Sequence, residues 1–132
     1  MSLGELERVF AFYSSVLLFK TLFLTGLTIY KRFQHQSFCK GPANAEVEAV
    51  RRCHLNDIEN LVPFLALGAW YCGISPSQSC ALWHFRIFAL ARVLHTPAYL
   101  LTEGRFPRGP IALAGIAVNV SMALQCMAYF WN

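Results

Sequence analysis

Charged residues are scarce in this chain of 132 residues. They make up 14% of the composition, whereas hydrophobic residues make up 56% and the mean hydropathy is +0.43. A soluble domain carries roughly 25% charged residues. The deficit argues against an ordinary soluble domain and indicates a chain that lies in a lipid bilayer.

Several catalytic and metal-binding signatures are also missing. The sequence has no G-x-S-x-G motif, no H-E-x-x-H motif and no P-loop. Its cysteines show no paired metal or disulfide spacing, so we interpret most of them as buried apolar thiols and predict no metal site. The net charge of +4 fits an anionic membrane face or an anionic ligand, but not a nucleic acid. The five cysteines are Cys39, Cys53, Cys72, Cys80 and Cys126.

Long apolar stretches occupy most of the chain. A membrane-spanning helix needs about 20 residues, with a range of roughly 17–25. Four stretches reach this length, the second only when its polar first turns are included. We therefore predict an all-α fold, an antiparallel four-helix transmembrane bundle, formed by a single domain over residues 1–132. The predicted spans cover about residues 9–30, 50–74, 80–101 and 109–131. The acidic N-terminus, with no cleavage site after the first stretch, predicts that this stretch is kept as a span.

The positions of lysine and arginine predict an orientation in the membrane. The connection between the first two spans and the connection between the last two carry 7 of the 11 basic residues. Cytoplasmic loops are enriched in lysine and arginine. We expect these two connections to face the cytoplasm and both chain termini to face the opposite side.

Two polar stripes lie on the second and third predicted helices. No glycine or proline separates the polar run of residues 51–60 from the apolar residues after it, so one helix should contain both. In this helix Arg52, Asn56 and Glu59 share a face. In the third helix Arg92, His95 and Tyr99 share a face at the same end of the bundle. Ionisable residues inside a membrane are costly, and by default they suggest a functional site.

Some residues of the later spans predict packing features. Pro97 lies inside the third predicted span and should interrupt the backbone hydrogen bonding there, because proline lacks the N–H group that would donate. In the fourth span Asn119 and Ser121 suit hydrogen bonds between helices, and Gly115 is one of several small residues that suit close helix contact.

Further basic residues bear on the same region as the two stripes. Lys20 lies in the middle of the first span, and we interpret it as paired inside the bundle with Asp57 or Glu59. Arg32 ends that span, and on the residues alone it is either an interface anchor or a ligand contact. Arg108 lies before the fourth helix, at the end where the stripes lie.

Two interpretations of this cluster remain open at this point. One is a structural ion-pair network, for instance between Glu59 and Arg92. The other is a binding site, because three arginines against one or two carboxylates leave surplus positive charge. That surplus favours an anionic guest that enters from the cytoplasm, beside apolar walls that suit a lipophilic partner. Residue spacing predicts an anion-binding membrane site and no specific reaction.

Two long motifs resemble a known family. Residues 52–64 read RCHLNDIENLVPF and residues 84–100 read HFRIFALARVLHTPAYL. They resemble the membrane-associated eicosanoid and glutathione metabolism (MAPEG) family, first its microsomal glutathione transferase branch and next its prostaglandin E synthase branch. The spacing of Lys20 and Arg32 and the position of Arg108 are also similar, so the resemblance covers nearly the whole chain.

The resemblance implies a homotrimer that binds glutathione between subunits near the cytoplasmic face. Carried over by position, Arg108 is the catalytic residue that stabilises the thiolate. Arg32 would come from an adjacent subunit, and Arg92 would support the pocket. The implied glutathione-binding residues are Arg32, Arg52, Asn56, Glu59, Arg92, His95, Tyr99 and Arg108.

The resemblance also implies an activity and a compartment. The expected enzyme is a membrane glutathione S-transferase that adds glutathione to lipophilic electrophiles and also reduces lipid hydroperoxides. The alternatives are a glutathione-dependent prostaglandin E synthase and a non-catalytic lipid-binding scaffold. Leu55, Gly109 and Ala112 differ from the synthase branch and weaken the first alternative. The expected location is the endoplasmic reticulum membrane or the mitochondrial outer membrane, with lipids as neighbours and no nucleic acid as partner.

Overall fold

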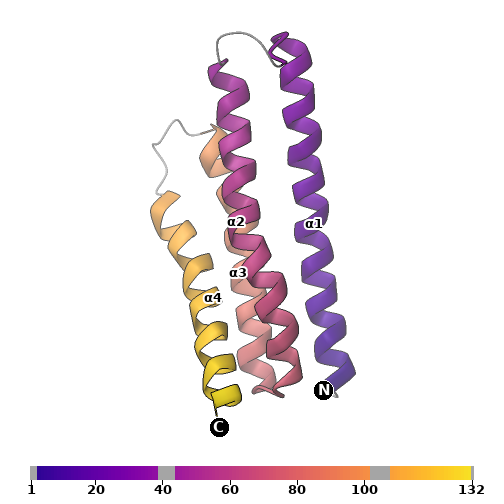
Figure 1. Cartoon of the computed structure of the whole chain (residues 1–132), viewed down its shortest axis with the longest axis vertical. Coiled ribbons are helices and arrows are strands. Elements are labelled where there is room, and N and C mark those ends of the chain that lie inside the picture. Colours follow the sequence, from indigo (N-terminus) through magenta and orange to yellow (C-terminus); the bar gives the residue numbers. More distant parts are fainter. Residues whose placement is uncertain (1–2, 39–43, 102–107, 132) are drawn as a thin grey trace.

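Four helices make up the described part of the chain, which comprises residues 3–38, 44–101 and 108–131 of a computed structural model. They are α1 (Leu3–Gln34), α2 (Ala45–Gly73), α3 (Gln78–Leu101) and α4 (Arg108–Trp131). Successive helices run in opposite directions, and the two chain termini lie at the same end of the bundle (Figure 1). The predicted all-helical, antiparallel architecture is therefore confirmed, and each predicted span lies almost entirely within one helix.

The long second helix begins at a specific cap. The Asn44 side chain accepts hydrogen bonds from the backbone N–H groups of Glu46 (2.9 Å) and Val47 (3.2 Å), which have no partner within the helix. From this cap α2 runs without a break through the polar residues and into the apolar ones, as predicted. It also continues through Pro63. Pro97 also lies inside its helix, and α3 continues past it to Leu101, as the predicted span of residues 80–101 requires.

The helices pack unevenly around one another. α2 and α3 lie between the outer helices, α1 contacts both of them, and α4 contacts both from the other side. Across the described residues α1 and α4 do not touch. The core is rich in aromatic rings, and Phe64 and Phe88 stack in parallel with centroids 4.0 Å apart. α2 and α3 therefore form the centre of the bundle and carry the two polar stripes.

The outer surface of the bundle is strongly apolar. α1 and α4 are each long and apolar enough to cross a membrane, and few residues of either span are buried. α1 alone exposes Phe12, Phe19, Leu22 and Phe23 by more than 60% each. Exposed apolar surface on this scale marks contact with lipid or with other protein chains. Composition therefore directly supports α1 and α4 as two of the four predicted spans. α2 and α3 are less apolar because they carry the charged stripes.

Three threonine hydroxyl groups on α1 donate hydrogen bonds within the helix. Thr21, Thr25 and Thr28 each donate a hydrogen bond to the backbone carbonyl four residues earlier, at 2.8–3.1 Å. This arrangement leaves none of these three hydroxyl donors to be satisfied by lipid, which offers no hydrogen bonds. It lets α1 carry three threonines and still present an apolar face.

A close approach between α1 and α2 makes a testable prediction. A Cβ atom at Gly68 would clash with the Phe10 ring, which is held between Phe64 and Phe85. We expect Gly68→Ala to lower the free energy of unfolding by about 1–3 kcal/mol through overpacking. A Cβ atom at the exposed Gly26 of α1 would meet open space, so Gly26→Ala should instead stabilise the helix by about 0.5–1 kcal/mol. Unfolding in mixed micelles measures the free energy of unfolding of both variants. Equal effects of Gly68→Ala and Gly26→Ala would contradict the close approach of α1 and α2 at Gly68.

Candidate functional site

An ion pair connects the first two helices in the middle of the bundle. The Lys20 ammonium donates to the Asp57 carboxylate at 2.5 Å and to the backbone carbonyl of Arg92 at 2.5 Å. The two side chains are only 13% and 4% exposed. Lys20 is therefore paired inside the bundle as predicted, with Asp57 rather than Glu59. Because its ammonium also contacts the backbone of α3, this one residue ties three helices together.

Arg92 is the most deeply buried charged side chain among the described residues, at 1% exposed. Its Nη1 donates to the Asn56 Oδ1 at 3.2 Å, which brings together one residue from each predicted stripe. Its Nε and Nη2 have no hydrogen-bond partner in the part of the chain that the structure describes. Those two nitrogens lie beside Gly115 of α4, where a Cβ atom would approach Nε to 3.4 Å. The guanidinium is therefore held on one side by α2, and a small residue of α4 makes room for it on the other.

The ion-pair network takes a different form from the pairing of Glu59 with Arg92 that the sequence suggested. Arg92 bonds to Asn56, and the Glu59 side chain lies exposed on α2. Asp57, which is 3% exposed, supplies the buried carboxylate instead. The buried part of the network holds Lys20, Asp57 and Arg92, and so contains two cations and one anion. This buried group therefore carries a surplus of positive charge, from Lys20 and Arg92 rather than from the three arginines that the sequence suggested.

The third-helix stripe lies next to this cluster. His95 is buried at 3% exposure, and its ring lies 5.7 Å from the half-buried Tyr99 ring, centroid to centroid. Arg52 and Glu59 are exposed on α2, on either side of the half-buried Asn56 along the helix. In the two stripes, Arg92 and His95 are therefore buried, Asn56 and Tyr99 are half-buried, and Arg52 and Glu59 are exposed.

The remaining predicted residues come from the ends of the outer helices. Arg32 lies in the last turn of α1 and is half-buried. Arg108 is the first residue of α4, and its side chain lies outside the described part of the structure. Its catalytic role therefore stays a prediction. Both residues lie at the end of the bundle where α2 begins, which is the end expected from the sequence (Figure 1).

An ion-pair group joins α1 to α2 beside Arg32. The Glu46 carboxylate accepts from the Lys31 ammonium at 2.6 Å and from the His35 ring at 3.2 Å. The hydrogen bond from Lys31, followed by the one from His35, lowers the pKa of Glu46 below its ordinary value. The ion pairs of ionised Glu46 therefore contribute to folding stability above the ordinary glutamate pKa. This contribution is lost as the pH falls through the lowered pKa of Glu46. Glu46 is exposed and its two partners are half-buried, so we expect the group to contribute little to the stability of the bundle.

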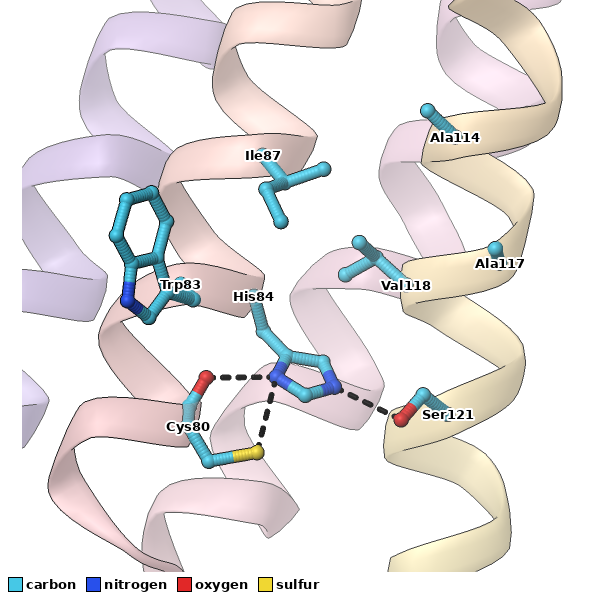
Figure 2. Close-up of a pocket in the computed structure, with 8 residues that line it drawn as sticks. All are labelled: Cys80, Trp83, His84, Ile87, Ala114, Ala117, Val118 and Ser121. Carbon is cyan, nitrogen blue, oxygen red and sulfur yellow. Dashed lines mark hydrogen bonds between the residues drawn. The ribbon is translucent and has the colours of Figure 1, made fainter. Parts of the chain in front are cut away.

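The structure also contains features that the sequence analysis did not assign. Gly115 was predicted only to suit helix contact, and its role beside Arg92 becomes visible only in three dimensions. A pocket between α3 and α4 lies away from the predicted site, and Cys80, His84 and Ser121 are part of its lining (Figure 2). Cys80 and His84 are four residues apart on one helix, which is the only sequence signal for it.

The predicted hydrogen bonds between helices are present in α4. Asn119 donates to the backbone carbonyl of Asn60 at 3.0 Å, and the Ser121 hydroxyl lies 2.8 Å from the His84 ring. Both expectations for this helix are therefore confirmed, and α4 is connected to α2 and to α3 by polar contacts.

The apolar outer faces, the antiparallel helices and the buried cationic cluster define a class, namely helical-bundle membrane proteins with a polar site between their helices. A sequence model of the MAPEG family matches residues 10–128. The chain belongs to the MAPEG family, as the two long motifs predicted.

Individual relatives cover almost the entire chain. Microsomal glutathione S-transferase 1 of Rattus norvegicus is 38% identical over an alignment of 140 positions, gaps included, that covers 94% of this chain and 90% of the relative. The Homo sapiens protein of the same name is 34% identical over 139 aligned positions, which cover 93% of this chain and 90% of that protein. Prostaglandin E synthase of Bos taurus is 32% identical over 142 aligned positions, which cover 98% of this chain and 90% of that protein. Both predicted branches are therefore represented among the relatives.

The buried charge cluster makes a second testable prediction. Asp57→Asn would leave Lys20 without its carboxylate in the buried cluster, and we expect it to lower the free energy of unfolding by about 3–5 kcal/mol. Adding Lys20→Met should recover part of this loss, because the double variant removes one cation with the anion. Unfolding of the single and double variants in mixed micelles measures the coupling. Glu48→Ala breaks only the exposed pair with Arg51 and should change stability little. If the stability changes caused by Asp57→Asn and Lys20→Met were additive, direct coupling between the two side chains would be contradicted.

Proposed function

We propose that this protein is a membrane-bound glutathione S-transferase that activates the glutathione thiolate for addition to lipophilic electrophiles. Membership of the MAPEG family, with microsomal glutathione S-transferase 1 relatives along 93–94% of the chain, carries this proposal. Reduction of lipid hydroperoxides is the second activity proposed for the same thiolate. The proposed glutathione site comprises Arg32, Arg52, Asn56, Glu59, Arg92, His95, Tyr99 and Arg108.

The charge of the cluster fits the chemistry of glutathione. Glutathione carries two carboxylates and one ammonium, so a suitable site offers several cations and one exposed anion. Arg52 and Glu59 are exposed on one face of α2, where they can reach a guest. Lys20 already neutralises Asp57, so the Arg92 charge is not cancelled by the buried carboxylate. Arg92 thus adds positive potential from inside the bundle and holds Asn56 in position.

Thiolate formation is the proposed chemical step. A guanidinium close to the sulfur favours the thiolate over the thiol, and Arg108 is the residue proposed for this role. The proton leaves the sulfur for solvent at the cytoplasmic end. The sulfur electron pair then forms a bond to the electrophilic carbon, whose leaving group departs with its bonding electrons. The apolar faces of the bundle allow the lipophilic partner to arrive from the bilayer.

A second copy of the chain is proposed to complete the site. Arg32 lies on α1, and in the single chain Arg52 and Glu59 are open to the outside. The exposed apolar face of α1 provides a surface for contact with neighbouring chains. We propose a homotrimer in which Arg32 reaches the glutathione of an adjacent subunit. The proposed location is the endoplasmic reticulum or mitochondrial outer membrane, with this end of the bundle towards the cytoplasm.

Prostaglandin E synthesis is the second candidate function. The Bos taurus relative of that name covers 98% of this chain, which is the observation in its favour. Leu55, Gly109 and Ala112 differ from that branch, so we rank it below conjugation. A synthase would isomerise a prostaglandin endoperoxide with glutathione present, whereas a conjugating enzyme would consume glutathione with an electrophile. A non-catalytic lipid-binding scaffold would do neither.

Glutathione difference absorbance in the thiolate band tests the proposal on the purified protein. We expect a thiolate signal in the wild type that Arg108→Ala removes, because the stabilising charge is gone. Arg52→Ala should weaken glutathione binding by roughly tenfold or more, as loss of a charge-assisted hydrogen bond does. Arg51→Ala provides a matched control, since Arg51 is the neighbouring arginine on the same helix and pairs with Glu48.

Three outcomes of this experiment would count against the proposal. A thiolate signal that survives in Arg108→Ala would exclude the proposed role of that residue. Equal weakening by the Arg51 and Arg52 substitutions would exclude a specific site on that face of α2. If the wild type shows no thiolate signal and calorimetry detects no glutathione binding, the enzyme proposal fails and the lipid-binding scaffold remains.

A further inference from the structure

A pocket of about 460 Å³ lies between α3 and α4, in the half of the bundle that contains the chain termini (Figure 2). Its volume is in the usual range for small-molecule sites, roughly 300–1,000 Å³. It opens on the outer surface, where Trp83 is 60% exposed and Ile87 is 42% exposed. Its lining residues are Cys80, Trp83, His84, Ile87, Ala114, Ala117, Val118 and Ser121.

One end of this α3–α4 pocket is polar, and its side chains are held by a network of hydrogen bonds. His84 Nδ1 lies 2.7 Å from the Cys80 carbonyl, which can only accept, so Nδ1 donates. In the neutral ring Nε2 is then the acceptor for the Ser121 hydroxyl at 2.8 Å. Gln125 donates to the Ser121 oxygen at 3.2 Å and accepts from the Tyr71 hydroxyl at 3.0 Å. Helices α2, α3 and α4 therefore hold the serine hydroxyl and the imidazole in fixed positions.

The rest of the pocket is apolar. Its walls are formed by Trp83, Ile87 and Val118, and the small side chains of Ala114 and Ala117 leave the space open. No charged side chain is among the described residues that line it. An ionic head group would therefore be buried without a partner, which is costly. A neutral guest with one hydrogen-bonding group fits this lining.

The direction of the pocket matches that of an amphiphile in a bilayer leaflet. His84 lies six residues, about 9 Å, after the start of α3 at the end that holds the chain termini. Ile87 and Ala114 lie further towards the middle of the bundle (Figure 2). The pocket thus runs along the helices for about two turns, polar towards the membrane surface and apolar towards its centre. A hydrocarbon chain in the leaflet at this end has the same direction and the same order of polarity.

We propose that the α3–α4 pocket binds one hydrocarbon chain of a neutral, hydroxyl-bearing amphiphile, whose hydroxyl donates to the Ser121 oxygen, the polar atom there that keeps an unused acceptor position. The site is separate from the proposed glutathione site, because His84 and His95 are eleven residues, about 16 Å, apart along α3. Binding there does not depend on glutathione or on Arg108. The protein would therefore have a lipid site in the leaflet at the end of its chain termini and a polar site near its other end.

Photolabelling of the full-length protein in phosphatidylcholine nanodiscs tests this proposal. The probe is hexadecanol with a mid-chain diazirine, and mass spectrometry locates the label. We expect labels on Trp83, Ile87 and the facing residues of α4. Ala117→Phe should fill the pocket and reduce labelling there roughly tenfold, the loss expected when a small apolar guest is excluded. Ala128→Phe is the matched control, because Ala128 is an exposed alanine of α4 outside the pocket and its replacement should leave labelling unchanged.

Competition then tests the chemistry of the head group. Unlabelled hexadecanol should displace the probe, whereas hexadecyl sulfate, with its fixed negative charge, should not. Ala114→Phe repeats the filling test if Ala117→Phe unfolds, and circular dichroism checks both. Labels spread evenly over the outer faces of α1 and α4, equal labelling of the Ala117 and Ala128 variants, or equal competition by the sulfate would each overturn the proposal.

Discussion

The buried contact between Lys20 and Asp57 is the constraint on which the rest of the structure depends. It joins α1 to α2 at 2.5 Å, and the same ammonium contacts the α3 backbone at Arg92. A lone charge at this depth would cost several kcal/mol. Pairing reduces that cost and leaves one cation, Arg92, whose charge is not cancelled. The polar centre therefore aligns three helices and keeps a positive potential between the two central ones.

The same need to satisfy polar groups shapes the other half of the bundle differently. There the interhelix contacts are neutral, formed by Tyr71, His84, Ser121 and Gln125. Charged and neutral networks thus occupy opposite halves of one bundle, separated by the aromatic core around Phe64 and Phe88. An anion is favoured near the first network and a neutral molecule near the second. This division gives the two proposed sites different guests.

Much of the fold follows from the sequence because apolar length and residue spacing act locally. The four helices, the continuous α2 and the pairing of Lys20 were predicted from these signals. The predicted third span runs through Pro97, and α3 contains that proline without ending there. The choice of Asp57 over Glu59 depends on the rotation of α2 against α1, which sequence periodicity does not define. The role of Gly115 depends in the same way on how α4 faces α3, so only the three-dimensional packing reveals it.

Residue spacing proposes which side chains form the candidate site, but it does not define how they are arranged. Spacing placed Asn56 and Arg92 on facing stripes, and their hydrogen bond at 3.2 Å confirms that the stripes meet. Spacing alone did not distinguish buried members from exposed ones. That difference matters, because a buried residue acts on a guest through its potential and its neighbours, whereas an exposed one can touch it. Arg52 and Glu59 open away from the single chain, and the apolar face of α1 is equally uncovered. In the proposed homotrimer, contacts with other copies would cover the apolar face of α1 and would enclose the exposed charges around an ionic guest.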